Sequence, residues 1–153
     1  MNSENEEDIN DEALKLIKIY ISQTQSALKI SQTICKHSGG NELSGDDIIC
    51  GLIYRLMNPM SQQEINDSLN KADEILNDEY SSEEDEDINF DNEKNILENN
   101  QWRKLKSNNC NCEICIKMRV NLLNYNNFQC NDNLSQLFQN SINETCNKYK
   151  INI

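Results

Sequence analysis

Three cysteines fall within six residues, at Cys110, Cys112 and Cys115. This Cys-x-Cys-x-x-Cys spacing brings three thiols close together just before a predicted helix. Thiolates are ligands that Zn²⁺ favours, and a structural zinc site has four ligands in a tetrahedron. The run therefore supplies three of the four ligands that a structural zinc ion would need.

The fourth ligand has several candidates. Cys130, which follows a turn at Asn126-Asn127, is the first choice, and Cys146 and His37 are the less favoured candidates. A zinc ion would stabilise a unit of about 45 residues, which is small for folding unaided. Free reduced thiols are the alternative interpretation. A catalytic role is disfavoured because no histidine lies nearby in sequence to activate a thiol.

Composition excludes several function classes. The chain has 153 residues, one histidine and four glycines. It contains no Gly-x-Ser-x-Gly and no His-Glu-x-x-His run, which are the signatures of common nucleophile and zinc-hydrolase enzymes. We therefore expect a non-enzymatic protein.

The expected location follows from two absent signals and the cysteine count. No stretch of about 18 apolar residues is present, and the first ten residues are acidic, so neither a membrane span nor a signal peptide is expected. Seven cysteines without a secretory signal favour reduced thiols. These features predict an intracellular protein that is neither secreted nor membrane-bound.

The charge of −12 is unevenly distributed and divides the chain into four parts. Residues 1–10 carry four acids and no base and are predicted to be a disordered head. Residues 11–80 hold helical apolar patterns. Residues 81–100 form an acidic linker that we also expect to be disordered, either a spacer or a tract that binds basic proteins. Residues 101–153 carry seven bases and three acids and form a small Cys-containing helical unit.

A long helix is predicted from Asp11 to about Lys36, because this segment lacks glycine and proline and has apolar residues at helical spacing. Two apolar rows cover more of its surface than a helix lying on a small core needs, so we expect a partner to cover it. The predicted dimer interface combines this helix with the next: Leu14, Ile17, Ile21, Leu28, Ile49, Leu52, Ile53 and Leu56.

Further helices are marked by their caps. Gly39-Gly40 supply the left-handed conformation that ends the long helix. Ser44 with Asp47, and Ser61 with Glu64, are spaced as capping pairs for two more helices. Apolar periodicity then predicts two C-terminal helices, from Glu113 to about Tyr125 and from Leu134 to about Tyr149. The fold class is therefore all-α.

The segment from the end of the long helix through Lys36-His37-Ser38-Gly39-Gly40 and Glu42-Leu43-Ser44-Gly45-Asp46-Asp47-Ile48 resembles the second half of a histone fold. The chain is most similar to uncharacterised histone-fold proteins of large (nucleocytoplasmic) DNA viruses, which also carry a Cys-x-Cys-x-x-Cys run and an aromatic-bearing helical tail. The resemblance covers residues 11–59 well and 108–151 loosely. A first histone-fold helix is missing, and the C-terminal segment is a candidate to replace it.

This resemblance implies a dimerising subunit, a homo- or heterodimer, associated with DNA or chromatin in viral genome packaging or transcription. It also implies a location in the host cytoplasm or nucleus, in a viral factory or in a virion. Six residues are the candidates for DNA contact: Lys36, His37, Asn41, Arg103, Lys104 and Lys106. The loop after the long helix is not basic, so we expect only weak DNA binding by this chain alone. The alternative is an acidic adaptor or nucleic-acid mimic that binds basic proteins without contacting DNA.

Overall fold

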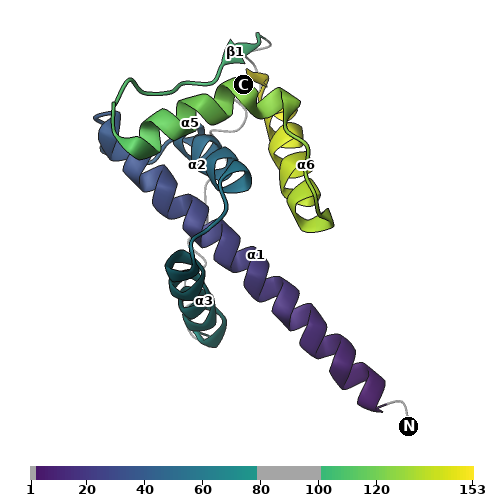
Figure 1. The fold of residues 1–153 in the computed structure, drawn as a ribbon. Coiled ribbons are helices and arrows are strands. Elements are labelled where there is room, and N and C mark those ends of the chain that lie inside the picture. Colours follow the sequence, from purple (N-terminus) through teal and green to yellow (C-terminus); the bar gives the residue numbers. More distant parts are fainter. Residues whose placement is uncertain (1–2, 79–100) are drawn as a thin grey trace, which may run out of the picture.

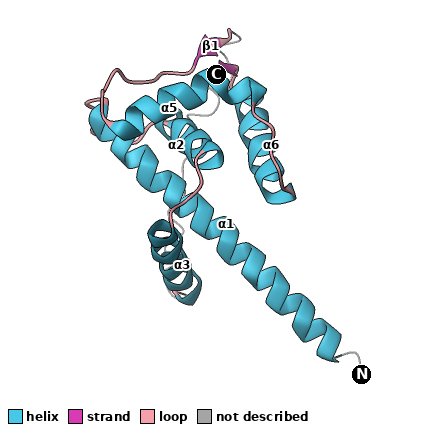
Figure 2. Ribbon diagram, viewed as in Figure 1, coloured by secondary structure: helices cyan, strands magenta, loops and turns pink. Residues whose placement is uncertain are grey.

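The computed structural model describes residues 3–78 and 101–153, and this part of the chain is almost entirely helical (Figures 1 and 2). Its elements are α1 (Ser3–His37), α2 (Gly45–Met57), α3 (Gln62–Asn77), β1 (Arg103–Lys104), α5 (Glu113–Asn124), the 3₁₀ turn η2 (Tyr125–Asn127), α6 (Asn133–Lys148) and β2 (Ile151–Asn152). The two short strands pair in parallel. The predicted all-α class is confirmed.

The long helix α1 begins earlier than predicted. It starts at Ser3 and runs for 35 residues, so residues 3–10 are helical and not a disordered head. Acidic side chains are favourable in the first turns of a helix because they face the positive end of its dipole, and that effect was left out of the prediction. The predicted linker, residues 81–100, lies outside the described residues.

The predicted caps are confirmed. Gly39 has a φ of +77°, the left-handed conformation that ends α1. Ser44 and Asp47 form a capping box at the start of α2, and Ser61 and Glu64 form another at the start of α3. These reciprocal bonds satisfy amide groups that would otherwise lack partners at each helix start, so the helix boundaries follow directly from local sequence.

Helices α1 and α2 cross in close contact at Gly51. A Cβ atom at this position would overlap Ser31 Oγ and the backbone carbonyl oxygen of Ala27. The Ser31 hydroxyl donates a hydrogen bond to that same carbonyl at 2.9 Å, so the polar group is satisfied inside the contact. Small residues on both helices therefore fix how closely the two backbones approach.

One hydrophobic core joins α1 and α2 to the segment 101–153. Buried residues from α1 and α2, such as Ile34 and Ile53, contact buried residues from α5 and α6, such as Met118 and Ile142. The segment 101–153 therefore shares its core with the N-terminal helices. Figure 1 shows α5 lying across the C-terminal end of α1 and over α2, while α3 lies along the middle of α1.

This core corrects part of the predicted dimer interface. Ile49 and Ile53 are only 6% and 0% exposed, because α5 and α6 cover α2. They contribute to the internal core and present almost no surface to a partner. Leu14 and Ile17, in contrast, are exposed on the N-terminal half of α1.

A second contact holds the segment 101–153 to α2. The Asp46 carboxylate accepts two hydrogen bonds from the Arg103 guanidinium, at 2.8 and 2.7 Å, and one from the Lys106 amide at 2.8 Å. Burial alone would raise the pKa of Asp46, but these hydrogen bonds lower it below its usual value. The folded structure therefore favours the charged form of the Asp46 carboxylate.

Replacing this carboxylate tests its contribution to stability. Asp46→Asn removes a charge-assisted pair and should lower the free energy of unfolding at pH 7 by about 2 kcal/mol. A carboxyl whose pKa is lowered by folding contributes its full stability above about pH 3.9 and loses it as pH falls through the folded-state value. Urea unfolding of both proteins should therefore show the difference shrinking as pH falls below about 4.

The matched control is an exposed ion pair. Glu113 and Lys117 form an i,i+4 pair on α5 whose Glu113 side chain is 80% exposed. Glu113→Gln should change the free energy of unfolding by less than about 0.5 kcal/mol. Equal effects of the two substitutions would show that the Asp46 contact does not hold the segment in place.

Candidate metal centre

His37 and three cysteines converge at one point of the fold. The distances from His37 Nδ1 are 3.1 Å to Cys112 Sγ, 3.3 Å to Cys110 Sγ and 3.6 Å to Cys115 Sγ. All four ligand atoms lie within 4.8 Å of one another. Ligand atoms around a tetrahedral zinc ion are about 3.5–3.8 Å apart, given metal–ligand bonds of 2.0–2.3 Å. The four residues can hold a metal ion.

Two helix ends position these ligands. His37 is the last residue of α1, where the negative end of the helix dipole favours a cation. Cys112 is the N-cap of α5, and its sulfur accepts a hydrogen bond from the Cys115 amide. The positive end of α5 favours thiolates at this place. The electrostatic field of the backbone therefore suits a cation bound by negatively charged sulfur.

The pKa values of two thiols shift in opposite directions. The hydrogen bond from the Cys115 backbone amide is the main cause that lowers the pKa of Cys112, to about 6. Burial raises the pKa of Cys115 to about 11. The lowered pKa of Cys112 favours its thiolate form, whereas Cys115 would have to lose its proton to bind a metal ion.

Asn108 organises the surroundings of the centre. This buried side chain donates through Nδ2 to Cys115 Sγ at 3.2 Å and to the Ile34 carbonyl at 3.3 Å. Its Oδ1 accepts hydrogen bonds from the Cys110 amide and from Arg119. Hydrogen bonds of this kind hold ligands in place and tune metal affinity. Asn108 therefore connects two of the ligands to α1 and α5.

The structure corrects the predicted fourth ligand. Cys130 donates a hydrogen bond to Gln139 Oε1 at 3.2 Å and lies outside the cluster, since it follows the far end of α5. Cys146 is buried in the core. His37, the remaining candidate, completes the set although it is 73 residues from Cys110. Only the packing of α5 against α1 and α2 brings them together.

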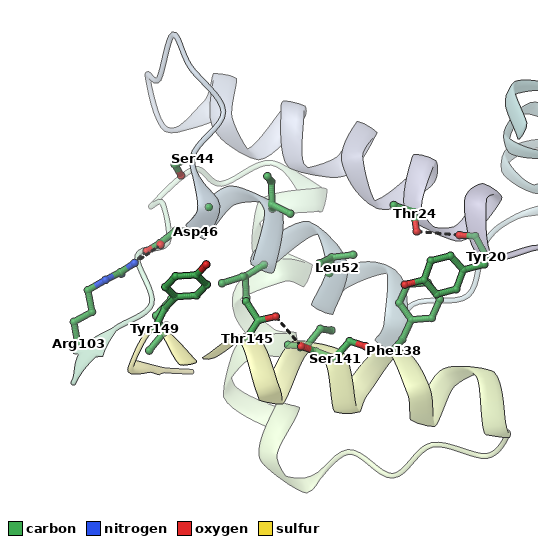
Figure 3. A pocket seen from close by; sticks show the side chains of 15 residues that line it. Tyr20, Thr24, Ser44, Asp46, Leu52, Arg103, Phe138, Ser141, Thr145 and Tyr149 are labelled. Carbon is green, nitrogen blue, oxygen red and sulfur yellow. Dashed lines mark hydrogen bonds and ion pairs between the residues drawn. The ribbon is translucent and has the colours of Figure 1, made fainter. Parts of the chain in front are cut away.

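A groove of about 780 Å³ lies on another face, between α2 and α6 (Figure 3). Tyr20 of α1 stacks on Phe138 at one end, with ring centroids 4.8 Å apart. The Arg103–Asp46 pair and Tyr149 stand at the other end. Apolar side chains such as Leu52 line the space between. The sequence analysis missed this groove because its two walls come from helices far apart in the chain.

The predicted DNA-contact residues are dispersed. His37 belongs to the cysteine cluster, and Arg103 is paired with Asp46. The other four, Lys36, Asn41, Lys104 and Lys106, are exposed. Two of the six predicted contacts therefore have partners within the protein.

Comparison with known proteins leaves the chain without a match. No family model, curated protein or solved structure matches it. Within the described residues, no helix has the length and apolar character needed to cross a bilayer. The site must therefore be interpreted from its own geometry.

The ligand set can be tested by titrating the metal-free protein with Co²⁺ and then displacing it with Zn²⁺. His37→Ala and Cys112→Ser should each abolish the thiolate-to-cobalt absorption of a tetrahedral site and weaken Zn²⁺ binding. Loss of a hydrogen-bonding neighbour of a ligand costs about 10–100-fold in metal affinity, so loss of a ligand should cost more.

Two variants serve as controls for this titration. Cys130→Ser should bind both metals like the unmodified protein; loss of binding in this variant with retention in His37→Ala would restore Cys130 as the ligand. Asn108→Asp should weaken binding about 10–100-fold because it cannot donate to Cys115. Asn121→Asp alters another buried asparagine of this segment, whose Nδ2 has no hydrogen-bond partner, and should leave binding unchanged.

Proposed function

We propose that this protein is a non-enzymatic assembly subunit, held in shape by one structural zinc ion, that dimerises through α1 and works in association with DNA or chromatin. The observation that carries the proposal is the apolar surface on the N-terminal half of α1. The metal centre and the shared core supply the rigid body from which this surface projects.

The N-terminal half of α1 extends beyond the other helices (Figure 1). Five large apolar side chains on it are between 44% and 58% exposed: Leu14, Leu16, Ile17, Ile19 and Tyr20. Helix α3 contacts one side of this half of α1, where Lys18 pairs with Asp73 at 2.9 Å. Large exposed apolar side chains gathered on one stretch of a helix are typical of a protein–protein contact. We define these five residues as the α1 strip.

Zinc is the metal proposed for the cluster. Three cysteines and one histidine are a common structural zinc set, and carboxylate-binding metals such as Mg²⁺ and Ca²⁺ prefer oxygen. Four protein ligands fill a tetrahedron and leave no position for a substrate or a reactive water. This supports a structural role, in which zinc fastens His37 at the end of α1 to the start of α5.

DNA or chromatin association rests on the resemblance to histone-fold proteins and on the exposed cations. Lys36, Lys104 and Lys106 are exposed and are available to phosphates. With a net charge of −12, the chain offers few such contacts, so each protomer contributes weakly and a dimer doubles the number.

Dimerisation is tested by Ile17→Asp. In the proposed interface this change buries an unpaired carboxylate, and a cost of about 3 kcal/mol corresponds to dimerisation about 100-fold weaker. Sedimentation equilibrium of the zinc-loaded full chain should show a dimer for the unmodified protein and mainly monomer for the variant at the same concentration.

Leu123→Asp is the matched control. Leu123 is a more exposed apolar residue, at 82%, on α5, outside the α1 strip and the groove. Its replacement should leave the dimer intact. A monomeric unmodified protein at all concentrations, or equal weakening by both substitutions, would remove the basis for dimerisation through α1.

DNA association is tested by salt titration. Binding to duplex DNA should weaken with rising salt, and Lys36→Ala or Lys104→Ala should each reduce the slope of log K against log salt by about 1. Binding with no salt dependence, or no binding, would favour the adaptor that contacts basic proteins only.

A further inference from the structure

We infer that the groove between α2 and α6 is the seat for the α1 strip of a second copy of this chain, so that the dimer is a reciprocal homodimer. The inference rests on the proposed dimerisation and specifies the partner and the surface. Three features of the described residues support it. The α1 strip adjoins the groove, the lengths of the strip and the groove are compatible, and their ends carry opposite charges.

The strip and the groove are continuous on one protomer. Tyr20 belongs to the strip and also lines the groove, where its ring stacks on Phe138 (Figure 3). A second copy related by a twofold axis near Tyr20 would lay its strip along this groove, and the first strip would lie along the second groove. Such an interface closes with two equal contacts and leaves neither strip exposed.

The length of the α1 strip is compatible with the length of the groove. The α1 strip, from Leu14 to Tyr20, advances about 9 Å at 1.5 Å per residue, and Asp11 lies about 14 Å from Tyr20. The α6 wall of the groove runs from Phe138 to Tyr149, which is about 17 Å at the same rise. One strip therefore fits within one groove and covers about half of its length, and the acidic residues before the strip lie near the far end of the groove.

Charges fix the direction of the seated helix. The strip is preceded by the exposed acids Asp11 and Glu12. The far end of the groove carries Arg103, which remains 47% exposed although paired, and the exposed Lys148 beside Tyr149. A twofold axis near Tyr20 brings the partner's acidic end to this basic end, since the two α1 helices then run antiparallel. Opposite charges at matching places favour this orientation.

The first experiment blocks the groove. Ser141 is exposed and lines the groove from α6, and Asn140, its exposed neighbour in sequence, does not line it. Ser141→Arg should weaken dimerisation at least about 10-fold, while Asn140→Arg should leave it unchanged, by sedimentation equilibrium of zinc-loaded protein. The helical circular dichroism and the Co²⁺ absorption of both variants must match the unmodified protein, which establishes that each is folded.

The second experiment mixes two variants that have complementary defects. Ile17→Asp has a defective strip and an intact groove, whereas Ser141→Arg has the reverse. A mixture of the two retains one of the two seats, so it should form heterodimers more tightly than either variant forms homodimers. If each strip packs only against the partner's strip, the mixture should show no such recovery.

The third experiment locates the contact. Leu16 is replaced by the photo-crosslinker benzoylphenylalanine, and ¹⁵N-labelled and unlabelled chains are mixed so that crosslinks between copies can be recognised. These crosslinks should reach residues 133–148 or 45–57. A dimer that tolerates Ser141→Arg and crosslinks strip to strip would overturn the groove as the seat while leaving proposed dimerisation standing. A protein that never dimerises would overturn both.

Discussion

The close crossing of α1 and α2 at Gly51 is the contact on which the other features depend. With only hydrogen at this position, the α2 backbone lies against Ser31 and Ala27 of α1. Helices that touch at small residues have a fixed separation, because no side chain can adjust between them. This crossing sets α2 beside the C-terminal half of α1, and α2 then provides the surface on which both α5 and α6 pack.

Two polar connections tie the C-terminal segment to this helix pair. The His37 and cysteine cluster joins the end of α1 to the start of α5, and Asp46 joins the start of α2 to Arg103 and the Lys106 backbone. Each connection lies at a helix terminus, where the backbone field favours the charge present there. The apolar core between them supplies the driving force, and the polar contacts fix the position.

The same packing decides which apolar surface stays outside. One face of the C-terminal half of α1, which includes Ala27 and Ile34, is buried where α2, α3 and α5 contact this helix, whereas the residues of the α1 strip are exposed. The groove lies between α2 and α6, and Phe138 and Tyr20 stack at one end of it. An apolar helix surface and an apolar groove on one small protein are complementary in kind, which is why a second copy suits both.

Sequence by itself determined the helices and most of their limits, although α1 begins at Ser3 and not at Asp11. Gly39, the Ser44 and Ser61 capping boxes and the apolar periods act within a few residues, so local rules sufficed for them. It also indicated three of the four ligands, because Cys110, Cys112 and Cys115 are neighbours in the chain. His37 as the fourth ligand, Asn108 beside it, and the burial of Ile53 were decided only by tertiary structure. Each depends on which helices pack together over more than 50 residues of separation, and no local spacing contains that information.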